Sequence, residues 1–177
     1  DGMRTNREAF WTHIQDKLPI SPERSEEISL DFYENDFNQA KCTTRPTPLS
    51  DQIVKAAKRK GLEVYLATNP VFPRCATMNR IRWAGLDAGD FKEITTYEEC
   101  RFCKPNPEYF RQILEKFDLD PAQCLMVGND VEEDLSIRRL GVSTYLVTDT
   151  MEDRKGQPFE SEYTGSLKDL LLFIQNL

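Results

Sequence analysis

The sequence predicts an α/β fold, a Rossmann-like doubly wound parallel sheet that follows a small helical region. Two observations support this fold class. From about residue 46 onward, short apolar runs alternate with amphipathic stretches, which is typical of strands joined by crossover helices in a parallel sheet. Several apolar runs end in polar residues, as at Thr68-Asn69 and Gly128-Asn129-Asp130. The carboxyl ends of parallel strands are where ligands bind in such sheets, so we expect the functional residues there.

Residues 1–45 show helical spacing without a strand signal. The apolar positions of a first helix are Phe10, Trp11, Ile14 and Leu18, and Pro19 ends it. A second helix restarts at Ser21-Pro22-Glu23 and includes Ile28, Phe32, Tyr33 and Phe37. The break at Pro46-Thr47-Pro48 predicts a boundary between a helical domain, 1–45, and an α/β domain, 46–177.

The α/β domain is expected to alternate helices with short strands. Thr47 caps a helix that begins at Pro48 and stops at Gly61. Further helices are expected from Pro73 to Gly85, from Asn106-Pro107 to Phe117, over 131–140, and after Ser166. Strands are expected at 62–67, 91–96, 124–127 and 144–147, and the polar stretch from about 149 to 164 is expected to be irregular.

Composition excludes several classes of function. The formal net charge of −7 disfavours nucleic acid and anionic membranes as partners, because both bind basic surfaces. The sequence contains no apolar run of the roughly 18 residues that a membrane span needs. The five cysteines include one C-x-x-C, Cys100 and Cys103, but the only histidine is the distant His13. We therefore expect reduced thiols in a cytoplasmic protein rather than a zinc site.

Three short stretches carry groups suited to phosphate and metal chemistry. Thr68 and Asn69 offer a hydroxyl and backbone N–H groups at a strand end, which suit phosphoryl oxygens. Lys104, before Pro105, can neutralise a phosphate or a carboxylate. Asp130 and Asp134 offer the hard oxygens that Mg²⁺ prefers. Each stretch alone also has a structural explanation: a polar strand end, an exposed lysine before a helix, and acids that favour a helix N-terminus.

Together, in this order, the three stretches resemble the haloacid dehalogenase-like hydrolase superfamily. Leu66-Ala67-Thr68-Asn69 is similar to its second motif, Cys103-Lys104-Pro105-Asn106-Pro107 to its third, and Val127 through Asp134 to its fourth. The resemblance covers roughly residues 46–148 and identifies the helical start as a partial cap. It implies a Mg²⁺-dependent phosphatase of a small phosphorylated metabolite that reacts through an aspartyl-phosphate. Thr68 and Asn69 would then bind the phosphoryl group, Lys104 would orient and neutralise it, and Asp130, Asn129 and Asp134 would hold Mg²⁺.

The first motif of that superfamily, Asp-x-Asp-x-Thr with the nucleophilic aspartate, does not occur in residues 1–177. The nearest string is Phe117-Asp118-Leu119-Asp120, but Pro121-Ala122 follows it, and we interpret it as a helix end. Without a nucleophile the polypeptide is expected to be inactive by itself. The first strand, expected between 62–67 and 124–127, is missing with that motif. We expect one of three compensations for this missing strand. The protein's own N-terminal segment or a strand of another copy takes its position in the sheet, or the two flanking strands pair directly with each other.

Three alternatives remain open. Asn129 stands where the family usually has Asp, and metal-independent dehalogenases of the superfamily also carry Asn near this point, which keeps carbon–halogen hydrolysis as an alternative. A catalytically inactive scaffold or binding protein with the same fold is the second. A signalling receiver domain is the third, although its Lys-Pro follows the last strand. The sequence leaves open the substrate, the oligomeric state and whether Asn129 or Asp130 is the metal ligand.

Overall fold

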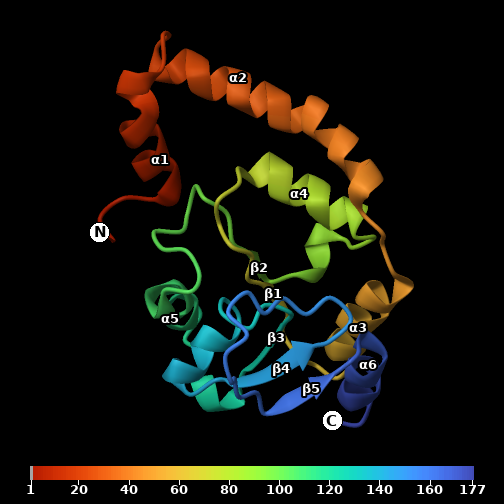
Figure 1. Cartoon of the computed structure of the whole chain (residues 1–177). Helices are drawn as coiled ribbons and strands as arrows, with labels where there is room; N and C mark the ends of the chain where they lie inside the picture. The colour runs from red at the N-terminus through yellow and green to blue at the C-terminus, as the bar shows by residue number, and fades with distance from the viewer. Residues whose placement is uncertain (1) are drawn as a thin grey trace. The chain divides into compact units, whose positions relative to one another are not determined.

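The computed structural model describes residues 2–177, which form two compact units (Figure 1). The first ends at Arg101 and the second spans Phe102–Leu177. All strands pair in parallel and helices alternate with them along the chain, so the predicted α/β class is confirmed. The division into a cap, 1–45, and a core, 46–177, stays a prediction. So does the strand missing between 62–67 and 124–127, because those two segments lie in different units.

The first unit opens with the two helices that the sequence predicts. Helix α1 (Asn6–Ile14) starts at Thr5, which forms a capping box with Glu8, and η1 (Gln15–Lys17) follows it. Helix α2 (Pro22–Glu34) is capped by Ser21. The prediction differs at Phe37, which lies in a separate 3₁₀ helix, η2 (Asp36–Thr43). The centre of the Phe37 ring lies 5.2 Å from the ring centres of both Tyr33 and Trp83, so this 3₁₀ helix contributes a side chain to the aromatic core of the unit.

The first unit continues with α3 (Pro48–Arg59), β1 (Tyr65–Leu66), α4 (Arg74–Trp83), η3 (Ala88–Asp90) and β2 (Glu93–Ile94). Thr47 caps α3, and Gly61 takes a φ of +78° just after it, as its stop signal predicts. Strands β1 and β2 pair only as Tyr65 with Glu93 and Leu66 with Ile94, so both are shorter than expected.

The second unit consists of α5 (Pro107–Lys116), η4 (Pro121–Gln123), β3 (Leu125–Gly128), η5 (Leu135–Leu140), β4 (Ser143–Val147), β5 (Tyr163–Gly165) and α6 (Leu167–Gln175). The three strands form one parallel sheet in the order β3-β4-β5 (Figure 1). In register, Gly128 pairs with Leu146, so the chain leaves β3 at the carboxyl edge of the sheet.

Two elements of the second unit differ from the prediction. Residues 131–140 are not one α-helix: a turn comes first, and η5 then ends at Gly141, whose φ is +86°. The stretch expected to be irregular ends in the short strand β5, whose Tyr163 and Thr164 are exposed, so no buried apolar pattern marks it. The interpretation of Phe117-Asp118-Leu119-Asp120 as a helix end is confirmed, because α5 ends at Lys116 and Asp118 has a φ of +51°.

Among residues 2–177, no helix is long and apolar enough to cross a membrane. The cysteines of this described part form no disulfide.

Candidate active site

The loop after β3 is organised by the carboxylate of Asp134. Its Oδ2 accepts hydrogen bonds from the backbone N–H groups of Asn129, at 3.0 Å, and Asp130, at 3.1 Å. Its Oδ1 accepts one from Lys104 Nζ at 2.7 Å. A Cβ on Gly128 would lie 2.1 Å from Asp134 Oδ2, which is closer than any side chain allows. Glycine at 128 is therefore what lets the carboxylate lie against this backbone.

Lys104 is a buried cation with one carboxylate partner. Only 6% of its side chain and 8% of that of Asp134 are exposed. The residue precedes α5, whose N-cap Asn106 accepts a hydrogen bond from Glu108 N, and the Lys104–Pro105 peptide bond is cis. The ammonium also lies 5.8 Å and 5.5 Å from the ring centres of Tyr109 and Phe110 on α5. Aromatic faces attract a cation, so α5 and Asp134 together fix the ammonium beside the loop.

Asp130 acts as the cap of the turn that it begins. Its Oδ1 accepts hydrogen bonds from Glu132 N at 3.0 Å and Glu133 N at 2.8 Å, while its own carbonyl accepts one from Asp134 N at 2.9 Å. Its Oδ2 accepts a hydrogen bond from the Arg154 guanidinium. Burial, and then the charge of Asp130, raise the pKa of the neighbouring Glu133. Both oxygens of Asp130 are therefore already engaged by donors of this chain.

Residues 150–155, which we call the strap, cross the loop after β3. Asn129 Nδ2 donates to Thr150 O at 2.6 Å, Glu152 N donates to Asn129 O at 2.8 Å, and Val131 N donates to Glu152 O at 2.9 Å. Asp130 and Glu152 thus form a parallel bridge beyond the named strands. Arg154 is a residue of this site that the sequence motifs do not mark. The sequence marks it only as one of two basic residues that follow two acids in Glu152-Asp153-Arg154-Lys155.

Thr68 and Asn69 lie beyond the carboxyl end of β1 in the first unit. Thr68 N donates to Thr95 Oγ1 at 2.9 Å, and Thr68 Oγ1 donates to Thr95 O at 3.0 Å. Asn69 O accepts a hydrogen bond from Val71 N at 2.9 Å. The segment after β2 therefore holds the predicted phosphate-binding turn in place within its own unit.

The predicted site residues thus fall into two groups. Lys104, Asn129, Asp130 and Asp134 come together in the second unit around the Asp134 carboxylate. Thr68 and Asn69 belong to the first unit, and their convergence with the other four stays a prediction.

The loop as folded does not fit a divalent metal ion. The oxygens of both Asp130 and Asp134 accept hydrogen bonds, and residues 2–177 contain no group of three His, Cys, Asp or Glu side chains that could hold a metal. Asn129 Nδ2 faces Thr150 O, so its amide is held by the strap. A metal at Asp130 would first have to displace a donor from this chain.

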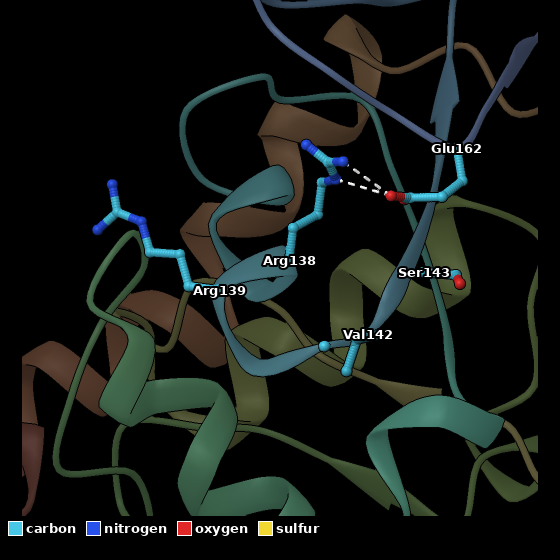
Figure 2. Close-up of a pocket in the computed structure, with 6 residues that line it drawn as sticks. Arg138, Arg139, Val142, Ser143 and Glu162 are labelled. Carbon is cyan, nitrogen blue, oxygen red and sulfur yellow. Dashed lines mark hydrogen bonds and ion pairs between the residues drawn. The ribbon is translucent and has the colours of Figure 1, made fainter.

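A pocket in the second unit lies at the opposite edge of the sheet, where β4 begins (Figure 2). Arg138 donates to Glu162 from Nε at 3.0 Å, whereas Arg139 points away from Glu162. Hydrogen bonds from Arg138 first and from Thr144 second lower the pKa of Glu162 to about 2. Because Arg138 is already paired and this edge is remote from the loop after β3, the pocket is not part of the candidate site.

Comparison with protein families gives a match over residues 3–148 to the model of haloacid dehalogenase-like hydrolases. A phosphoserine phosphatase of Thermus thermophilus is 26% identical over 170 residues, which are 94% of this chain and 64% of that protein. A pyrophosphatase, PpaX, of Bacillus cereus is 26% identical over 131 residues, 71% of this chain and 58% of that protein. The chain thus spans less than two thirds of the length of these curated relatives.

Solved structures share the fold at low sequence identity. A hydrolase from Pseudomonas syringae superposes with a TM-score of 0.64 at 16% identity, over 99% of this chain and 80% of that chain. An L-2-haloacid dehalogenase from Xanthobacter autotrophicus gives a TM-score of 0.61 at 16% identity, over 78% of this chain and 64% of that chain.

Proposed function

The chain belongs to the haloacid dehalogenase-like hydrolases, and from this premise we propose that it is the phosphate-handling part of a phosphatase for a small phosphorylated metabolite. The curated relatives include proteins named as phosphoserine phosphatase and pyrophosphatase, which supports phosphoryl transfer as the reaction class. The observation that carries the proposal is the buried Lys104, which Asp134 and two aromatic rings hold beside the loop after β3. A fixed cation in a dry site stabilises the charge of a transferring phosphoryl group.

The proposed roles follow from the contacts of each residue. Lys104 binds and neutralises a phosphoryl oxygen, and Asp134 positions Lys104 and the backbone of Asn129 and Asp130. In the first unit, Thr68 contributes its hydroxyl and Asn69 its backbone N–H to phosphoryl binding. The attacking aspartate is not among the motifs of residues 1–177, so we propose that an Asp-x-Asp-x-Thr segment outside these residues supplies it and forms the aspartyl-phosphate.

Mg²⁺ is the cofactor that the family implies, and Asp130, Asn129 and Asp134 are the residues of this chain that would hold it once the donors that now engage them are displaced. When bound, Mg²⁺ would neutralise charge on the phosphoryl oxygens. In the conformation described above, Asp130 is paired with Arg154 instead.

The test is turnover of a generic phosphate monoester by a form of the protein that includes an Asp-x-Asp-x-Thr segment. Lys104→Ala is expected to lower kcat/KM on the order of a hundredfold or more, as loss of an electrostatic stabiliser typically does. Lys116→Ala, at the exposed end of α5, is the matched control and is expected to leave kcat/KM unchanged. Residues 1–177 alone are expected to show no turnover. Mg²⁺-dependent turnover by pure, mass-verified residues 1–177 would contradict the proposed position of the nucleophile.

Carbon–halogen hydrolysis is the second candidate. Two features favour a site that works without a metal. Asn129 stands in the place of an acid, and donors of this chain engage the carboxylates of both Asp130 and Asp134. Chloride release from a 2-chloro carboxylic acid in the presence of EDTA, without phosphate release from phosphomonoesters, would select this candidate. Phosphate release alone would select the phosphatase.

A further inference from the structure

Thr68 and Thr95 bring two hydroxyl groups together in the first unit, beyond the ends of β1 and β2. Their Oγ1 atoms lie 3.3 Å apart, and either can donate to the other. Thr95 N donates to Leu66 O at 3.0 Å, which fixes the backbone of Thr95 beside the end of β1. Only 4% of Thr95 is exposed, whereas Thr68 is partly exposed. The pair therefore consists of one hydroxyl on a buried residue and one on a residue that a ligand can reach.

The Thr68 hydroxyl has a single hydrogen and two uses for it. In the structure it donates to Thr95 O at 3.0 Å. A hydroxyl hydrogen rotates toward the acceptor that suits it best, and the oxygen that carries it can accept as well. When Thr68 donates to a phosphoryl oxygen, as the proposed function requires, its hydrogen must turn away from Thr95 O. A hydrogen bond to the Thr68 oxygen from another donor would then support the new bond.

Thr95 is placed to supply that hydrogen bond. Three acceptors lie at nearly the same distance from Thr95 Oγ1: Leu66 O at 3.3 Å, Thr68 O at 3.2 Å and Thr68 Oγ1 at 3.3 Å. All three distances exceed the usual separation of about 2.7–2.8 Å, so the Thr95 hydrogen changes its acceptor at little cost. Thr95 Oγ1 also accepts from Thr68 N at 2.9 Å, which keeps the two residues together whichever way the hydrogen points.

We propose that Thr95 is a positioning residue for the phosphoryl group, because it donates to Thr68 Oγ1 while Thr68 donates to a phosphoryl oxygen. The inference rests on the proposed function in taking Thr68 as a phosphoryl ligand. In a chain of hydrogen bonds each bond polarises the next, so a Thr68 hydroxyl that accepts from Thr95 is the stronger donor. The gain is largest toward an anion, since hydrogen bonds to charged acceptors are the strong ones. No covalent bond changes, because the two hydroxyl hydrogens only rotate.

The experiment measures kcat/KM for a generic phosphate monoester, with the form of the protein that includes an Asp-x-Asp-x-Thr segment. Thr95→Val keeps the shape of the side chain without the hydroxyl and is expected to lower kcat/KM about five- to tenfold, the size of one hydrogen bond. Thr95→Ser keeps the hydroxyl and is expected to stay within about twofold of the wild type.

Thr96→Val is the matched control. Thr96 is the next residue of the chain and only 1% of it is exposed. Among the residues that the structure describes, its hydroxyl has no hydrogen-bond partner. Thr96→Val thus removes a buried hydroxyl of the same kind without touching Thr68, and kcat/KM is expected to stay within about twofold of the wild type.

A double-mutant cycle with Thr68→Val separates positioning from support of the fold. Thr68→Val alone is expected to lower kcat/KM by at least as much as Thr95→Val. Since Thr95 acts through the Thr68 hydroxyl, adding Thr95→Val to Thr68→Val is expected to cost less than about twofold more. A residue that only supported the fold would cost the same factor in both backgrounds.

The outcomes separate the inference from the proposed function. Wild-type kcat/KM in Thr95→Val, with Thr68→Val impaired, would overturn the inference and leave the proposed function standing. An equal loss from Thr95→Val with and without the Thr68 hydroxyl would also overturn it, as would an equal loss in Thr95→Ser or Thr96→Val. Absence of turnover by the wild type, or full activity of Thr68→Val, would overturn the proposed role of Thr68 and the inference with it.

A second variant covers the case in which Thr95→Val fails to fold. Thr95→Cys keeps the size of the side chain and replaces the hydroxyl by a weaker donor, so it is expected to lower kcat/KM about threefold or more. Wild-type kcat/KM in Thr95→Cys would overturn the inference.

Discussion

Lys104 Nζ lies 2.7 Å from Asp134 Oδ1, with 6% and 8% of the two side chains exposed. Removing one member of such a pair leaves the other charge buried without compensation, which is far more costly than removing both. Asp134→Asn is therefore expected to lower the free energy of unfolding by about 3–5 kcal/mol. Urea unfolding measures this change. The double variant Lys104→Met/Asp134→Asn is expected to be more stable than Asp134→Asn alone, and a double variant less stable than either single variant would contradict a coupled buried pair.

Gly128→Ala is expected to displace the Asp134 carboxylate. The added Cβ would lie 2.1 Å from Oδ2 and 2.6 Å from the Asp134 Cβ, so Asp134 must move away from the backbone N–H groups that it binds. We expect a loss of about 1–3 kcal/mol in unfolding free energy, the cost of buried donors left unpaired. Gly89→Ala is the control, because its nearest atom would be Asp87 Oδ1 at 3.4 Å. Equal stability of the two variants would show that the loop after β3 adapts freely.

The Glu162 carboxylate is expected to stabilise the folded protein to an extent that depends on pH. Hydrogen bonds from Arg138 and Thr144 lower its pKa from 4.5 to about 2 in the folded protein. Because the unfolded chain takes up the proton first as the pH falls, the stabilisation is complete above about pH 4.5 and is lost as the pH falls toward 2. Glu162→Gln is therefore expected to be less stable than the wild type at neutral pH. The difference in unfolding free energy between the two proteins is expected to shrink as the pH falls below about 4.5.

Urea unfolding of the wild type and Glu162→Gln at several pH values measures this difference. Glu160→Gln serves as the control, because Glu160 meets the same arginine but its side chain is 84% exposed. A constant gap between the wild type and Glu162→Gln from neutral to acidic pH would contradict the assignment.

Asn129→Asp is expected to loosen the strap. The Asn129 amide donates to Thr150 O at 2.6 Å, and a carboxylate cannot donate that hydrogen bond and would repel the carbonyl. Amide hydrogen exchange of residues 150–155 in EDTA is therefore expected to become about tenfold faster, while exchange in α6 stays unchanged. Unchanged exchange in residues 150–155 would mean that the remaining backbone contacts hold the strap without Asn129.

Helix starts were predicted well because their signals are local. Ser21, Thr47 and Asn106 each precede a proline at the first helical position, and each accepts a hydrogen bond from a backbone N–H in the first turn. Strand lengths were predicted poorly, because a strand extends only as far as its partner pairs with it. The sequence predicts strands over residues 62–67 and 91–96, yet these segments pair at only two positions.

The acids and the lysine of the candidate site were predictable because a known pattern marks them at strand and helix ends. The partner of Asp130 was not. Arg154 is 24 residues away in the sequence, in a stretch without periodicity, and its contact depends on the strap crossing the loop. Local sequence could not indicate that crossing, because Thr150 and Glu152 take part through their backbone carbonyl and N–H groups, which every residue type carries.

The close approach of Asp134 to Gly128 also has an evolutionary consequence. A relative with a side chain at the position of Gly128 has no room for a carboxylate in the place that Asp134 occupies, and a relative without that carboxylate has no need of the glycine. The two positions are therefore expected to change together during divergence. Where both have changed, the lysine that corresponds to Lys104 has lost its counter-charge, so such lineages should have replaced that lysine as well.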